Sequence, residues 1–308
     1  MQLLLTIILD IITPVFILIA LGVILHRKFT LDLNTLSKLT TYLLLPVIGF
    51  VNIYESRIGA EMLLLIFVFW LCQSLVLISM VEVSSKVFKF DKRLASTYKN
   101  SIVLNNSGNF GLPVSQLVFA GNSFGQSIQI LMMVLQNLLT YTYGLVNSIS
   151  ASTTGMKEIM KQFLKIPILY ALLLGLIFNS FSVQVPSFVW QPIENITNAF
   201  IAVALLTLGA QSAYIKVQKP SLPLVLSLIG RLLISPAAAL VIIYLLQLEG
   251  TIAQGLFIAS AFPSSRNSAS FALEYNNYPE YAAQTVLLST ILSSITVTIV
   301  VFLSTILF

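Results

Sequence analysis

Long runs of apolar residues constrain this chain more than any other feature of its sequence. The runs at 62–81 and 285–308 are each near the roughly 20 residues with which a helix crosses a ~30 Å hydrocarbon layer. Only 9% of the 308 residues are charged, whereas soluble domains carry about 25%. The chain is therefore predicted to be an all-α polytopic membrane protein.

Hydropathy, together with the positions of proline and glycine, predicts ten membrane spans. The first span has no basic segment before it and is longer than the apolar core of a signal peptide, so we expect a retained helix. The spans lie near residues 3–25, 33–54, 62–85, 99–120, 126–149, 166–183, 196–214, 222–247, 251–276 and 282–306.

The basic residues predict the orientation of these spans. Most of the 16 lysines and arginines lie in or beside the odd-numbered connections. By the positive-inside rule those connections are cytoplasmic, so both termini are expected outside the plasma membrane. Because the basic residues are split among short loops, nucleic acid binding is not expected. The segment 155–165 could form an amphipathic helix on the inner membrane surface, or a plain linker.

Two features predict an internal repeat. The first and sixth spans share a proline and a glycine eight residues apart, in PVFILIALGVIL at 14–25 and PILYALLLGLIF at 167–178. The fourth and ninth spans are both polar and contain a proline. Five spans are an odd number, so the second copy must be inverted in the membrane. The predicted organisation is a repeat at 1–149, a cytoplasmic linker at 150–165 and an inverted repeat at 166–308.

The fourth span contains the polar stretch LNNSGNFGLPV at 104–114. Its glycines and proline predict a break in the helix, and irregular backbone survives in a membrane only where protein or water satisfies it. The asparagines could bind Na⁺ or a polar substrate, or only satisfy the break. The candidates here are Asn105, Asn106, Ser107 and Asn109 for ion coupling, and Asn109, Gly111 and Pro113 for substrate.

The ninth span reads IASAFPSSRNSASFALEY at 258–275. Pro263 predicts a second break, and Ser264 or Ser265 can cap the helix that follows it. The positive end of that helix and the guanidinium of Arg266 favour an anion, and a carboxylate fits the guanidinium fork. An internal carboxylate is the alternative partner. The substrate-binding candidates are Pro263, Ser264, Ser265, Arg266 and Asn267.

Other ionisable residues lie within predicted spans. Arg231 needs a partner inside the membrane, for which Glu82 and Glu274 are candidates. Asp10 could relay protons, or lie close enough to the outer interface to be hydrated. These three acidic residues are the candidates for H⁺ coupling. One cysteine and one histidine predict no metal cluster, and no cofactor is expected.

The motifs NNSGNFGLPV and FPSSRNSASFALEY, supported by YLLLPVIGF and ALLTLGAQSAY, resemble the auxin efflux carrier family, including its bacterial malate and malonate permease-like members. The resemblance covers nearly the whole chain. It implies a ten-helix, two-repeat fold related to the bile-acid sodium symporters. Spans 1, 2, 6 and 7 would form a scaffold, and spans 3–5 and 8–10 a transport domain. The crossing would fall at 109–113 and 263–267.

The predicted function is a secondary carrier, not an enzyme, that moves a small organic anion such as malate by alternating access. Coupling to Na⁺ or H⁺, or uniport without an ion, stays open. A sensor or receptor with a carrier-like fold is an alternative. An intramembrane hydrolase is disfavoured, because His26 lies at a membrane face beside Arg27 and Lys28. The expected partners are the anion and membrane lipids, and a homodimer is possible.

Overall fold

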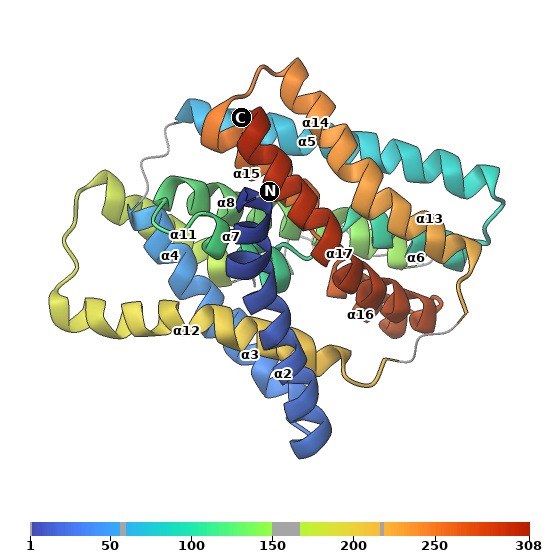
Figure 1. Cartoon of the computed structure of the whole chain (residues 1–308), viewed down its shortest axis with the longest axis horizontal. Coiled ribbons are helices and arrows are strands. Elements are labelled where there is room, and N and C mark those ends of the chain that lie inside the picture. Colours follow the sequence, from blue (N-terminus) through green and yellow to red (C-terminus); the bar gives the residue numbers. More distant parts are fainter. Residues whose placement is uncertain (1, 56–59, 150–166, 216–218) are drawn as a thin grey trace.

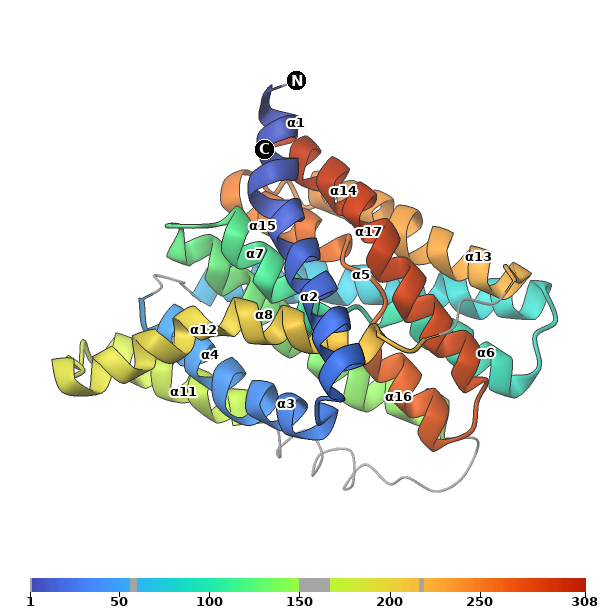
Figure 2. The same cartoon turned by 60° about the horizontal axis from the view of Figure 1, so that its bottom comes forward.

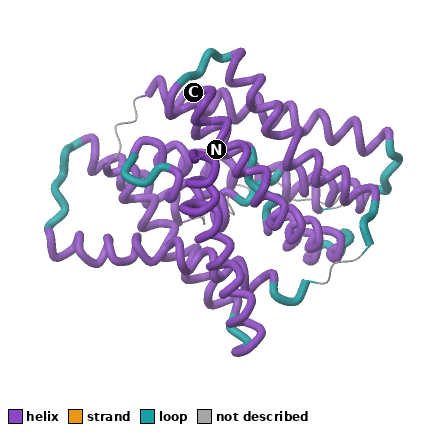
Figure 3. The backbone as a smooth tube through the Cα atoms, viewed as in Figure 1, coloured by secondary structure: helices purple, strands orange, loops and turns teal. Residues whose placement is uncertain are grey.

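The computed structural model describes residues 2–55, 60–149, 167–215 and 219–308. Throughout the described residues the chain is helical, with short connections (Figure 3). Their one pairing of extended backbone is an isolated antiparallel bridge between Asn105 and Ser264. The all-α class is thereby confirmed. The linker at 150–165, with its predicted amphipathic helix, lies outside the described residues.

The first half of the chain runs from α1 to α9, and its helices contain four π-helical turns. These elements are α1 (Gln2–Thr6), η1 (Ile7–Ile12), α2 (Thr13–Phe29), α3 (Leu33–Leu39), η2 (Thr40–Leu44), α4 (Leu45–Glu55), α5 (Ala60–Val87), α6 (Lys92–Val103), η3 (Ser107–Gly111), α7 (Leu112–Val118), α8 (Ser123–Leu139), η4 (Thr140–Gly144) and α9 (Leu145–Ser148).

The second half runs from α11 to α17, and one π-helical turn joins α13 to α14. These elements are α11 (Pro167–Ser180), α12 (Ser187–Ser212), α13 (Leu222–Ile229), η5 (Gly230–Ile234), α14 (Ser235–Leu245), α15 (Gly250–Ser260), α16 (Arg266–Glu274) and α17 (Pro279–Leu307).

Six helical runs in the described residues are long and apolar enough to cross a membrane. They are Gln2–Phe29, Leu33–Glu55, Glu61–Val87, Ser187–Ser212, Leu222–Leu245 and Pro279–Leu307, and α11 and α15 are shorter apolar helices. The membrane-protein prediction is thus confirmed, whereas the count of ten spans stays a prediction. The predicted fourth and ninth spans are each divided into two short helices.

Two helices begin earlier than the spans predicted there, because hydropathy does not register how far a helix extends. The fourth span was expected to begin near residue 99, but α6 begins at Lys92. There the Asp91 carboxylate accepts the backbone N–H groups of Arg93 and Leu94 at 3.0 and 3.1 Å. The seventh span was expected from residue 196, but α12 begins at Ser187, since polar residues lower hydropathy without preventing a helix.

The helices pack in pairs that an inverted repeat would relate. α2 packs on α12 as α11 packs on α4, which pairs span 1 with 7 and span 6 with 2. Both contacts are close. A Cβ added to Gly209 would lie 1.9 Å from the Ile19 carbonyl oxygen, and one added to Gly175 would lie 2.9 Å from that of Phe50. Likewise, α5 packs on α6 as α14 packs on α15.

The two ends of the described chain lie on the same side of the molecule. N and C are side by side in both Figure 1 and Figure 2, and α1 and η1 pack against α17. Termini on one side are what an even number of crossings requires. That this side faces outward stays a prediction.

Candidate functional site

Two extended segments cross where the predicted fourth and ninth spans are broken. α6 ends at Val103 and α15 at Ser260. Beyond them, the Asn106 N–H donates to the Pro263 carbonyl at 2.8 Å, and the Ser265 N–H donates to the Leu104 carbonyl at 2.8 Å. The structure therefore brings the two predicted breaks together as an antiparallel pair.

Pro263 lies in the second break as predicted, but Pro113 does not lie in the first. The crossing occupies residues 104–106, earlier than the predicted 109–113. Pro113 instead stands in the first turn of α7, directly after the π-helical turn η3. The widened turn accommodates the missing N–H of the proline, so the helix continues through it.

Neighbouring side chains satisfy the broken backbone, as hydrocarbon requires. The Ser264 hydroxyl donates to the Ser101 carbonyl at 2.6 Å, and the Ser289 hydroxyl accepts the Ser264 N–H at 3.1 Å. From the other side, the Gln136 amide donates to the Val103 carbonyl at 3.3 Å. These bonds hold the two segments in a fixed register.

A cavity of about 240 Å³ lies beside the crossing, and most of its lining carries amide or hydroxyl groups. The amide nitrogen of Asn106, which lines it, is buried and has no hydrogen-bond partner. A buried amide without a partner is costly, so a polar group that enters the cavity would find a hydrogen-bond donor there. The lining comprises residues 105–109 and 265–267 with Thr41, Tyr42, Leu45, Met133, Gln136, Asn137, Thr140, Tyr141, Pro167 and Ile168.

Arg266 brings a positive charge to this cavity. It is the first residue of α16, whose N-terminus is capped by the Ser265 hydroxyl, which accepts the Asn267 N–H at 3.2 Å. Its Nη1 donates to the Ser37 hydroxyl of α3 at 3.1 Å. Among the described residues, the ion-pair distance is met only by Lys99 and Glu82. Arg266 therefore has no carboxylate partner in the described part of the chain.

Several predicted site residues build the crossing without lining the cavity. Pro263 and Ser264 form the crossing itself, and Gly111 and Pro113 lie behind it. A Cβ on Gly111 would come within 2.4 Å of the Phe262 ring, so a glycine is needed for this close approach.

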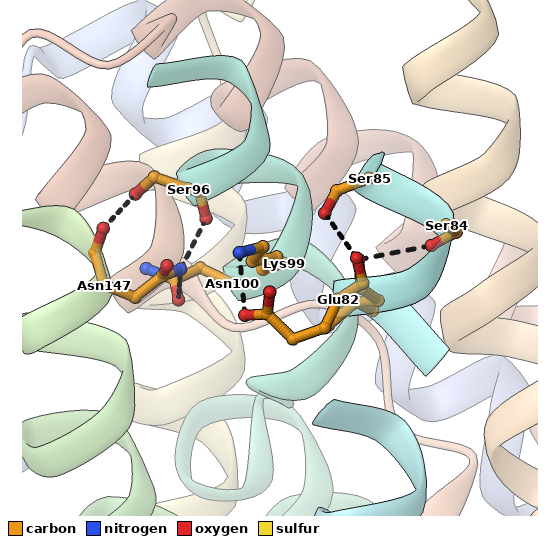
Figure 4. A network of polar contacts seen from close by, with 8 residues as sticks. Glu82, Ser84, Ser85, Ser96, Lys99, Asn100 and Asn147 are labelled. Carbon is orange, nitrogen blue, oxygen red and sulfur yellow. Dashed lines mark hydrogen bonds and ion pairs between the residues drawn. The ribbon is translucent and has the colours of Figure 1, made fainter. Parts of the chain in front are cut away.

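None of the three acidic candidates lines the cavity. Asp10 and Glu274 are exposed, on η1 and at the end of α16. Glu82 accepts from Lys99 at 2.7 Å (Figure 4).

Beside that ion pair, a polar network joins α6 to α9, as Figure 4 shows. The Asn147 amide donates to the Ser96 carbonyl and to Asn100 Oδ1, both at 2.9 Å, and the Ser96 hydroxyl donates to the Asn147 carbonyl at 2.6 Å. The Asn277 amide, after α16, donates to the Ser148 carbonyl at 2.7 Å. These bonds tie α6, and the residues that follow α16, to α9.

The predicted carboxylate partners of Arg231 are wrong. Its guanidinium donates to the carbonyls of Ile102, at 2.8 Å, and Ser260, and to the Ser235 hydroxyl. Glu82 pairs with Lys99 instead. Helix ends supply carbonyl groups that no sequence pattern marks as a partner for a charge.

Part of the cavity lining was not among the predicted site residues. Thr41 and Tyr42 come from η2, and Thr140 and Tyr141 from η4, each within a π-helical turn. The one available signal was the polar stretch QNLLTYTYG at 136–144 inside an apolar span.

Comparison with known families gives one result for most of the chain. A family described as membrane transport protein matches residues 7–301. No curated protein matches the chain.

Proposed function

The chain belongs to the membrane transport protein family, and we propose that it is a secondary carrier for small organic anions. The observation that carries this proposal is the position of Arg266, whose guanidinium meets a polar cavity at the crossing without a carboxylate partner among the described residues. An arginine within a membrane span is costly, and an anionic ligand at the half-buried Arg266 guanidinium would offset part of that cost.

The chemistry of the cavity favours a carboxylate. Its two oxygens can accept two parallel bonds from the Arg266 guanidinium. The unpartnered amide of Asn106 and the N-terminus of α16 add further donors. A small dicarboxylate such as malate or malonate suits a cavity of this size and polarity. The malate and malonate permease-like subtype is proposed on this basis.

The positions of the lining residues, taken with the predicted topology, support a cavity that opens toward the cytoplasm. Tyr42 lies soon after the connection at 30–32, Tyr141 lies shortly before the linker, and Pro167 directly follows it. All of these connections are predicted to be cytoplasmic, so we infer an inward-facing state. Toward α7, the rings of Phe16, Phe110 and Phe262 pack together, with centroids 6.4 and 6.2 Å apart, and would close the outer side.

Alternating access would then move one group of helices against the other. The proposed scaffold comprises spans 1, 2, 6 and 7, from which α4, α11 and α12 lie together in Figure 1. The proposed transport domain comprises spans 3–5 and 8–10, held together by the polar network around Asn100 and Asn277. The ten-span inverted repeat and a plasma-membrane location with both termini outside are parts of the same proposal.

A ligand screen followed by uptake tests this function. Purified protein would be heated with malate, malonate or other small carboxylates, and with the corresponding neutral amides as controls. Binding to the folded state at 100 times Kd adds about 2.7 kcal/mol, which raises the melting temperature measurably. The carboxylates that stabilise the protein are expected to enter proteoliposomes. The proposal would be contradicted if none of the carboxylates stabilised the protein, or if only the neutral amides did.

A further inference from the structure

Arg231 is the most deeply buried charge in the described residues, and it takes no part in the cavity. Its side chain is 1% exposed and belongs to the π-helical turn η5. It is not among the residues that line the cavity at the crossing. The desolvation of a fully buried guanidinium is costly, so favourable interactions with neighbouring groups must offset it.

The hydrogen bonds of Arg231 show which groups supply these interactions. Nη1 donates to the carbonyl of Ile102 in the last turn of α6, at 2.8 Å. Nη2 donates to the carbonyl of Ser260, the last residue of α15. The Ser235 hydroxyl, which accepts from Nη2, itself donates to the Ser260 carbonyl at 2.8 Å. One guanidinium therefore bridges the C-terminal ends of both half-helices.

The charges at this point balance. A helix C-terminus carries about −0.5 elementary charge, so two such ends together present about −1, which one arginine offsets. In discontinuous membrane helices, the carbonyls at such ends are groups that commonly coordinate Na⁺ or H⁺. Here the guanidinium occupies these carbonyls. In contrast to these two C-terminal ends, the helix end at the cavity is the N-terminus of α16, which begins with Arg266.

We propose that Arg231 is a covalently attached counter-cation of the crossing and replaces a bound metal cation there. It is a positioning residue, because it fixes the ends of α6 and α15 from which the chain continues into the crossing segments that line the cavity. Transport therefore needs no Na⁺ at these carbonyls. This inference rests on the proposed function for its transport readout, but the cation-binding readout does not depend on it.

The experiment compares cations in the wild type and in Arg231→Ala, Arg231→Lys and the exposed-site control Arg93→Ala. Melting temperature in detergent and uptake in proteoliposomes are measured in sodium, choline or millimolar guanidinium chloride. The wild type and Arg93→Ala are expected to behave alike in sodium and choline. Arg231→Ala should lose at least about tenfold in uptake, because its half-helices are misplaced. Guanidinium or Na⁺, but not choline, should restore part of its melting temperature.

Several results would overturn the proposal. They are specific stabilisation of the wild type by Na⁺, Na⁺-dependent uptake by the wild type, and an Arg231→Ala protein that small cations stabilise no more than choline. If Arg231→Ala does not fold, the test rests on the wild type and Arg231→Lys. Both keep the positive charge, so their melting temperatures and uptake must be the same in sodium and in choline. The melting measurements need no substrate, so they stand even if no organic anion is transported.

Discussion

Replacing Arg266 tests the candidate site most directly, because its guanidinium is the positive side chain that lines the cavity. Of its N–H groups, one donates to Ser37, which leaves a pair for the two oxygens of a carboxylate. Hydrogen bonds to charged groups contribute about 1.5–3 kcal/mol each. The side chain is partly exposed, so hydration reduces the gross value for two bonds to about 2–3 kcal/mol.

That free energy corresponds to a loss of about 30–150-fold in affinity for the anion in Arg266→Gln. Arg266→Lys keeps the charge but not the planar fork, and we expect a smaller loss, of about tenfold. Affinity is measured by titration of the melting temperature with the carboxylate that stabilises the wild type most. Arg93→Ala, on the exposed face of α6, removes an arginine of the same charge far from the cavity lining and serves as the control.

The reasoning is refuted if Arg266→Gln binds the anion with the affinity of the wild type while remaining folded. It is also refuted if Arg93→Ala loses as much affinity as Arg266→Gln, because the effect would then come from net charge. A loss of affinity confined to the Arg266 variants places the anion at the crossing.

Three further predictions concern stability. Gly209→Ala should cost about 1–3 kcal/mol in thermal unfolding, because its Cβ would meet a backbone carbonyl of α2 at 1.9 Å; Gly108→Ala, whose nearest neighbour would be 3.5 Å away, is the matched control. Ser265→Ala should cost about 0.5–2 kcal/mol by removing the cap of α16, seen as faster hydrogen exchange there, and Ser265→Asn should restore it. Desolvation raises the pKa of Asp91, but hydrogen bonds from α6 N–H groups and Tyr278 outweigh it and leave that pKa below its usual value. Its stabilising effect is therefore present above the unfolded pKa of about 3.9 and lost as pH falls through the folded pKa, and Asp91→Asn should remove that loss from melting curves.

The sequence located the crossing in one span better than in the other, and the reason is local. In the ninth span the proline lies in the non-helical segment itself, so Pro263 and the break coincide. In the fourth span the break comes before Ser107, and Pro113 follows a π-helical turn that absorbs its missing N–H. Proline shows where a donor is absent. The chain becomes extended where another segment replaces the helical hydrogen bonds. Here the Pro263 carbonyl accepts from the fourth span, and the Leu104 carbonyl accepts from the ninth.

The two arginines within predicted spans show what a sequence cannot distinguish. Arg231 and Arg266 both lie within predicted spans, and for both the sequence suggested a carboxylate. Helix direction separates them. Arg231 meets two C-terminal ends, whose carbonyls supply about one negative charge and accept hydrogen bonds from both of its terminal nitrogens. Arg266 begins a helix, where the polarity is positive, so its neighbours add to its charge. Of these two arginines, the second still requires an anion, and it lines a cavity with room for one.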